Sequence, residues 1–219
     1  MPGLNFTLER AEAVPFAAAP TIAFTLRVTN LNLTQAIQSI ALRSQILIEA
    51  TRRHYTPEER HNLRDLFGEP DRWSQTLRSL LWTHVSTTVP GFSGSIVMEV
   101  PVPCTFDFNV GAAKYFHAAQ DDDVPLCFQF SGTIFYAAPD GALQISQIGW
   151  DKEARFRLPA AVWREMMDHY YPDSAWLRLR RDTFERLNAY KTRNGIASCE
   201  DAIERLIEQP SPLEKGAAR

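Results

Sequence analysis

The segment from Pro125 to Trp150, PLCFQFSGTIFYAAPDGALQISQIGW, decides the fold that we expect for this chain. Two apolar and aromatic runs, Pro125 to Ala137 and Leu143 to Trp150, flank the turn sequence Ala-Pro-Asp-Gly. Aspartate followed by glycine suits a tight turn, because glycine adopts a positive φ angle without steric cost. The segment therefore predicts a β-hairpin.

Four more runs upstream of this hairpin are typical of strands, namely residues 21–29, 40–50, 81–89 and 95–102. In the first two, apolar and polar residues alternate, which is the period of a strand with one buried face. Thr56-Pro-Glu-Glu59 followed by Gly68 predicts one short helix at 57–67, since it combines a capping box with a glycine stop. Six to eight strands with little helix between them favour an antiparallel sandwich.

After Trp150 the apolar period changes from two to about 3.6 residues, which indicates helices. We expect one helix that ends at Pro172, a longer helix capped by Ser174, and a last helix opened by Ser198 to Asp201. The predicted protein is therefore α+β. It has an antiparallel sandwich-like body at 1–150, a helical extension at 151–208 packed on it, and a mobile tail at 209–219.

Bulk composition excludes several classes of protein. The 219 residues are 45% hydrophobic and 22% charged, which is ordinary for a globular chain, and a net charge of -3 argues against nucleic-acid binding. Cys104, Cys127 and Cys199 are too widely spaced for a zinc cradle or a disulfide framework, so a reducing, cytoplasmic location is expected. The N-terminal residues do not resemble a signal peptide, and no apolar run reaches the length of a membrane helix.

Candidate catalytic or metal sites are few. No phosphate-binding loop or dinucleotide fingerprint is present, and the glycines at 91–94 are interpreted as a turn rather than a serine elbow. Cys104 or Cys127 could act as a thiolate nucleophile, or bind a metal, if His84 or His117 lay beside it. Buried structural cysteines are the alternative interpretation, and no cofactor is expected.

Acidic residues 121–123 lack the pattern of a calcium loop, so we interpret them as a solvated loop.

The best interaction candidate is the basic segment from Arg178 to Arg193, flanked by aromatic side chains. Tryptophan, tyrosine and arginine are the residue types enriched at binding hot spots. We therefore select as partner-binding candidates Arg178, Arg181, Trp176 and Tyr171. The alternative interpretation is that these cations form the solvated back of an amphipathic helix.

Several blocks of this sequence resemble an uncharacterised bacterial protein family of about this length. They are FSGTIFY at 130–136, IGWDKE at 148–153, WREMMD at 163–168 and SAWLRLRRDTF at 174–184, with similar stretches at 73–82 and 102–104. The family is associated with gene neighbourhoods of nickel-iron hydrogenases, and no activity or catalytic residue is attached to it. The resemblance therefore implies a context, with a hydrogenase component as partner, but no mechanism.

Together these observations favour a noncatalytic accessory or protein-binding factor, which the resemblance connects with assembly or maturation of a hydrogenase-type metalloenzyme. One alternative is an enzyme or metal-handling protein whose Cys/His site is assembled from distant residues. Another is a structural subunit that forms homo-oligomers through exposed strand edges.

Overall fold

The structure, a computed structural model, describes residues 2–104, 110–119, 123–138, 140–174, 177 and 179–208. The chain divides into two compact units, Met1–Ser174 and Ala175–Arg219. The first unit is a sandwich-like body of two antiparallel sheets with short helices, so the predicted α+β class is confirmed. In the described ranges, no helix is both long and apolar enough to cross a membrane.

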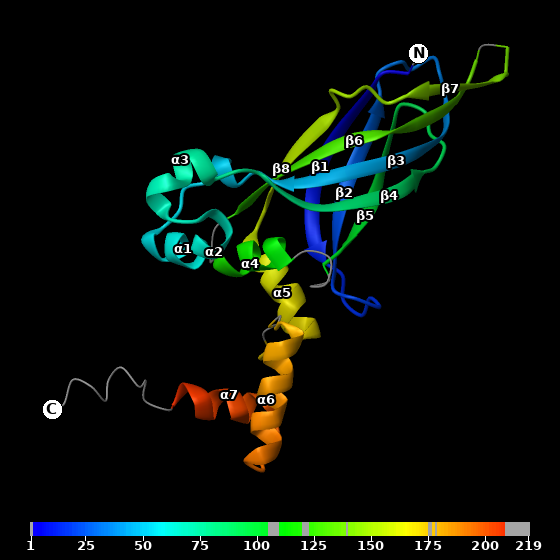
Figure 1. Ribbon diagram of the computed structural model, residues 1–219. Helices are drawn as coiled ribbons and strands as arrows, with labels where there is room; N and C mark the ends of the chain where they lie inside the picture. The colour runs from blue at the N-terminus through cyan, green and yellow to red at the C-terminus, as the bar shows by residue number, and fades with distance from the viewer. Residues whose placement is uncertain are drawn as a thin grey trace. The chain divides into compact units, whose positions relative to one another are not determined.

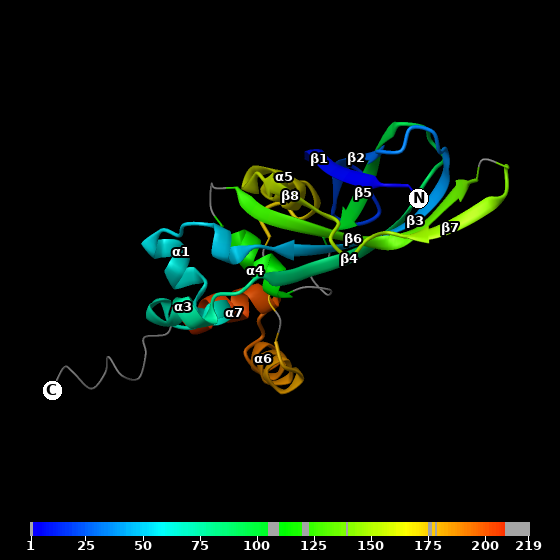
Figure 2. The same cartoon turned by 90° about the horizontal axis from the view of Figure 1, so that it is seen from above.

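Two sheets form the body and lie as separate layers in Figure 2. The three-stranded sheet has the order β1 (Leu4–Ala13), β2 (Thr21–Asn30), β5 (Ser95–Pro103). The five-stranded sheet has the order β4 (Leu80–Val89), β3 (Ile37–Ile48), β6 (Val124–Ala137), β7 (Leu143–Gln147), with β8 (Glu153–Leu158) also paired to β6. The hairpin expected from the Asp-Gly turn is the β6–β7 pair, and its Gly141 has φ 84°.

Aromatic side chains fill the space between the sheets. The ring of Phe24 on β2 lies 5.0 Å from that of Phe128 on β6, measured between centroids, and 6.2 Å from that of Trp82 on β4. Phe6 on β1 stacks on Phe130 at 4.2 Å. Each contact joins one sheet to the other, so this layer is the core of the body.

Short helices gather at one end of the sheets (Figure 1). Between β3 and β4 lie η1 (Ala50–Arg52), α1 (Pro57–Asn62), α2 (Arg64–Phe67), η2 (Pro70–Arg72) and α3 (Trp73–Thr76). The others are α4 (Val110–Ala118) and α5 (Ala160–Tyr170). The predicted capping box is confirmed, because the Thr56 hydroxyl accepts from the Glu59 amide and Glu59 accepts from the Thr56 amide. The single helix expected at 57–67 is instead broken at Leu63.

A cluster of buried polar side chains connects η1, α1 and α4. Arg53 donates to Glu59 over 2.5 Å, and their side chains are only 2% and 3% exposed. The Tyr55 hydroxyl donates to the Ala50 carbonyl and lies 2.6 Å from the hydroxyl of Tyr115 on α4. Burial raises the pKa of both tyrosines, so the two hydroxyls stay protonated and connect η1 to α4.

The expected boundary at residue 150 is corrected by the structure. Residues 153–158 form β8, which pairs with β6, and the first unit continues through α5 to Ser174. The longer helix begins at Arg181 rather than after Ser174. Ser174 does not cap it, because its hydroxyl donates to the carbonyl of Pro172.

In its described residues, the second unit has two helices, α6 (Arg181–Arg193) and α7 (Cys199–Ile207). Gly195, at φ 63°, follows α6, and the Ser198 hydroxyl accepts from the Asp201 amide at the start of α7, as expected. Packing of these helices on the body stays a prediction. The tail expected at 209–219 lies outside the described residues.

Candidate functional site

The two cysteines that were candidate nucleophiles are buried thiols. Cys104 follows β5 and donates through Sγ to the Val102 carbonyl at 3.3 Å, and burial raises its pKa to about 12. Burial, together with the carboxylates of Glu153 and Glu49, raises the pKa of Cys127 on β6 to about 11. Neither side chain is a thiolate at neutral pH, which argues against a cysteine nucleophile at either position.

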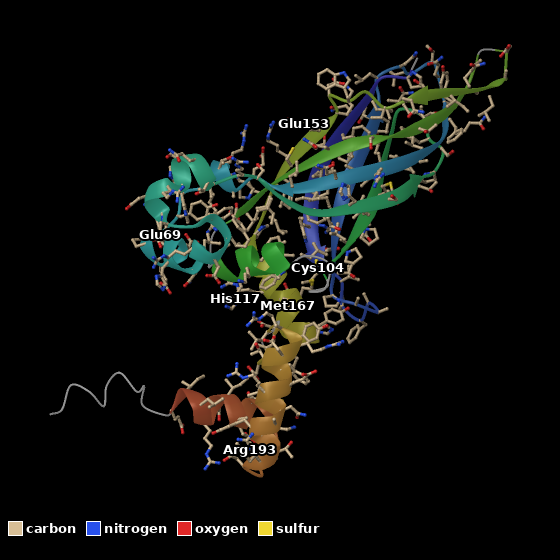
Figure 3. All side chains as sticks on the ribbon, viewed as in Figure 1. Glu69, Cys104, His117, Glu153, Met167 and Arg193 are labelled. Carbon is tan, nitrogen blue, oxygen red and sulfur yellow. The ribbon has the colours of Figure 1, made fainter. Side chains whose placement is uncertain are left out.

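The candidate histidines do not join these cysteines. His84 is exposed on β4 with Nε2 3.2 Å from Gln45 Oε1, and His117 is exposed on α4. Within the described ranges, no hydrogen bond links either histidine to Cys104 or Cys127, and no three His, Cys, Asp or Glu side chains converge as metal ligands. Figure 3 labels Cys104 and His117 near α4, with Glu153 well away from them on β8. Of the acidic loop at 121–123, residues 121 and 122 lie outside the described residues.

The raised pKa of Cys104 predicts a loss of stability in alkaline solution. In the unfolded chain this thiol titrates near its ordinary value of 9.0, and in the folded chain at about 12. The unfolded state therefore binds fewer protons above pH 9, so the free energy of unfolding falls with rising pH, by about 1.4 kcal/mol per unit between the two pKa values. Urea unfolding at a series of pH values measures this slope.

The matched variants for this prediction are Cys104→Ala and Cys199→Ala, since Cys199 is only partly buried. Cys127 and the two buried tyrosines also contribute to the alkaline slope, so we expect Cys104→Ala to reduce it by about 1.4 kcal/mol per pH unit and Cys199→Ala to leave it unchanged. An unchanged slope in the Cys104→Ala variant would contradict the assignment.

The partner-binding candidates fall in different places. Arg178 and Trp176 lie outside the described residues. Tyr171 is the half-buried residue that ends α5 in the first unit, and Arg181 is the exposed first residue of α6 in the second. No feature of the described residues joins these candidates into one site.

A groove instead lies within the second unit, between α6 and α7. Its volume is about 610 Å³, and its walls are mostly apolar. Leu187 and Tyr190 contribute from α6, and Ile203 and Leu206 from α7. The apolar period of about 3.6 residues predicts that each helix has an apolar face, but it could not show that the two faces leave a hollow between them.

Two guanidinium groups are the charged part of the groove lining. Arg186 and Arg193 both come from α6, and Figure 3 labels Arg193 at the end of that helix. Where the structure describes side chains, neither arginine has an ion-pair partner, whereas Arg180 pairs with Asp182 at 3.6 Å. The groove therefore offers apolar contacts and two positive charges that are available to a ligand.

The residues of the second unit that the structure describes form almost no core of their own. None of the residues of α6 is buried, and Ala202 is the only buried residue in the described part of this unit. Large apolar side chains stay open to solvent, including Phe184 at 51% and Ile207 at 76%. Within the described residues of this unit, these side chains therefore form an apolar surface that the two helices do not cover themselves.

Comparison with known proteins identifies a family that matches this chain, but it identifies no activity. A family model described as a "Family of unknown function (DUF6084)" matches residues 1–215. No curated protein matches the chain.

Several solved structures resemble parts of the fold at low similarity. A protein described as late embryogenesis abundant (LEA) is 18% identical over 73% of each chain, with a TM-score of 0.31. The CARDB domain of a Pyrococcus furiosus protein, in complex with di-metal ions, is 11% identical over 72% of this chain and 87% of its own, with a TM-score of 0.28. A Bordetella pertussis protein described as ApaA is 14% identical over 72% and 94%, with a TM-score of 0.24. None of these similarities is high enough to carry an argument about function.

Proposed function

This chain belongs to the DUF6084 family of unknown function, and we propose that it is a noncatalytic accessory protein that binds a partner protein through the groove between α6 and α7. The observation that supports the proposal is the groove itself, an apolar hollow of about 610 Å³ on a unit whose described residues bury almost no side chains. Apolar grooves between helices are the usual site for an amphipathic helix of a partner.

The charges of the groove indicate the partner's chemistry. Arg186 and Arg193 line it without an ion-pair partner among the described residues, and the lining contains no acidic side chain. An apolar helix face bordered by aspartate or glutamate would satisfy both arginines, whereas a basic helix would be repelled. The proposed occupant is therefore an acidic amphipathic helix of another protein.

A wider context rests on the sequence resemblance alone. On that basis, the proposed source of the acidic helix is a component of a hydrogenase-type metalloenzyme. The proposed process is assembly or maturation of that enzyme. The widely spaced cysteines support a cytoplasmic location for this role.

The proposal predicts selective binding of a designed peptide. The probe is a fluorescent helical peptide with leucine at positions i, i+3, i+4 and i+7 and glutamate on the flanking positions. Its counterpart carries lysine in place of every glutamate. Fluorescence anisotropy with the full chain should show saturable binding of the acidic peptide and weaker binding of the basic one, because the arginines discriminate by charge.

Two variants locate this binding. Leu206 lines the groove, whereas its neighbour Ile207 is 76% exposed and does not. We expect Leu206→Asp to weaken binding of the acidic peptide by about tenfold or more, and Ile207→Asp to leave it within about twofold. Equal effects of the two substitutions would overturn the assignment to the groove.

A charge reversal tests the selectivity. In the Arg186→Glu/Arg193→Glu variant the preference should switch to the basic peptide. The control reverses two exposed arginines of the body, Arg43→Glu/Arg157→Glu, with the same change of net charge. A switch in this control as well would show that net charge, rather than the groove, selects the peptide.

A further inference from the structure

The strand β7 is an unusual edge of the five-stranded sheet. It pairs with β6 on one side only, and Figures 1 and 2 show the β6–β7 hairpin extending beyond β3 and β4. Its sequence Leu143-Gln-Ile-Ser-Gln147 has no charged residue and no proline, and its register with β6 has no bulge. Leu143 is 57% exposed and Ile145 is 61% exposed. The outer backbone groups of such a strand are open to pairing with another strand.

Other edges of the two sheets are protected. On β5, Pro101 and Pro103 remove backbone donors and Glu99 adds a charge. On β1, the register shifts between Leu8 and Arg10. These are devices that prevent one sheet edge from adding to another, and β7 has none of them.

The two remaining edges are also blocked. The strand β8 carries exposed charges at Glu153, Arg155 and Arg157, and it contacts β1. The strand β4 has no formal charge, but its pairing with β3 is interrupted by a register shift, and β4 contacts both β5 and α4. Among the edge strands that the structure describes, β7 is therefore the one that combines an open backbone with exposed apolar side chains.

We propose that β7 is a self-association site, at which β7 pairs antiparallel with β7 of a second copy of this chain. The absence of charge favours a second copy as occupant, because β7 can face a copy of itself without like charges meeting, whereas a two-fold pairing of β8 about Arg155 would place two arginines opposite each other. The central residue of the strand is Ile145. A two-fold axis beside it brings the two Ile145 side chains together and Leu143 opposite Gln147, so that the five-stranded sheets of both copies join into one. The proposal is independent of the α6–α7 groove.

Sedimentation velocity of the full chain at increasing concentration tests this inference. We expect a reversible dimer in the parent. Ile145→Lys should raise the dimer dissociation constant by about tenfold or more, because two lysines would then face each other across the axis. The control is Val97→Lys on β5, which introduces the same charge at a protected edge. Val97 is 44% exposed, and the variant should dimerise like the parent.

A circular dichroism melt of each variant shows whether it is folded, and Ile145→Glu, which would place two glutamates face to face, replaces Ile145→Lys if the latter unfolds. Leu206→Asp separates the two surfaces, since it alters the groove and leaves β7 intact. A parent that stays monomeric overturns the proposal. So does a dimer that survives Ile145→Lys or is lost in Leu206→Asp.

Discussion

Replacing Gly132 with alanine is expected to destabilise the body by at least about 4 kcal/mol, the range of the most damaging single substitutions. Gly132 lies in β6 opposite Leu42 of β3 and has a φ angle of 140°, which side-chain-bearing residues rarely adopt. A Cβ atom there would lie 2.0 Å from the carbonyl oxygen of Ala41, so the backbones of β3 and β6 would have to separate. The free energy of unfolding from urea denaturation measures this effect.

Gly141→Ala is the matched control for Gly132→Ala. Gly141 has φ 84°, but a Cβ atom there meets nothing within 4 Å, so only backbone strain of about 1–2 kcal/mol is expected. The ordering of the two variants is the critical result. If Gly132→Ala were no more destabilising than Gly141→Ala, the close approach of β3 and β6 would be wrong.

Glu59→Ala is expected to lower the free energy of unfolding by about 3–5 kcal/mol, the range seen when one partner of a buried ion pair is removed. The substitution removes the Glu59 carboxylate, which lies 2.5 Å from the Arg53 guanidinium group. The side chains of both residues are almost completely buried. It also removes the acceptor for the Thr56 amide at the start of α1. Thermal and urea unfolding of the full chain measure the change.

The neighbouring residue Glu58 provides the control for Glu59→Ala. Glu58 is exposed in the same first turn of α1, so Glu58→Ala should change the free energy of unfolding by no more than about 0.5 kcal/mol. A similar small change for Glu59→Ala would mean that the polar cluster contributes little to stability.

Local signals in the sequence predicted the parts of the fold that depend on neighbouring residues. The Asp-Gly turn marks the β6–β7 hairpin, and Thr56 with Glu59 forms the expected capping box. The strand β1 was missed, because the apolar alternation of Leu4, Phe6 and Leu8 stops where the bulge begins. The strand β8 was missed although its charged residues alternate with apolar ones, because it has only six residues and its partner β6 lies on the far side of β7 in the sequence.

The candidate site depended on contacts that no local pattern encodes. Periodicity identified the apolar stripes of α6 and α7, and composition identified their basic residues. The hollow between the stripes is a property of two helices packed together, so neither stripe alone predicts it. The same reason made the Cys/His candidates uncertain, since only the fold could show that Cys104 and Cys127 are buried thiols.

Hydrogen–deuterium exchange of the full chain, with and without the acidic amphipathic peptide, tests the central claim most directly. Binding in the groove should slow amide exchange within α6 and α7, because both helices line it and are poorly protected by burial when the groove is empty. Exchange in β6 should not change. Slower exchange in α6 and α7 that is lost in Leu206→Asp is the predicted result. Saturable peptide binding that leaves exchange in both helices unchanged would contradict the account.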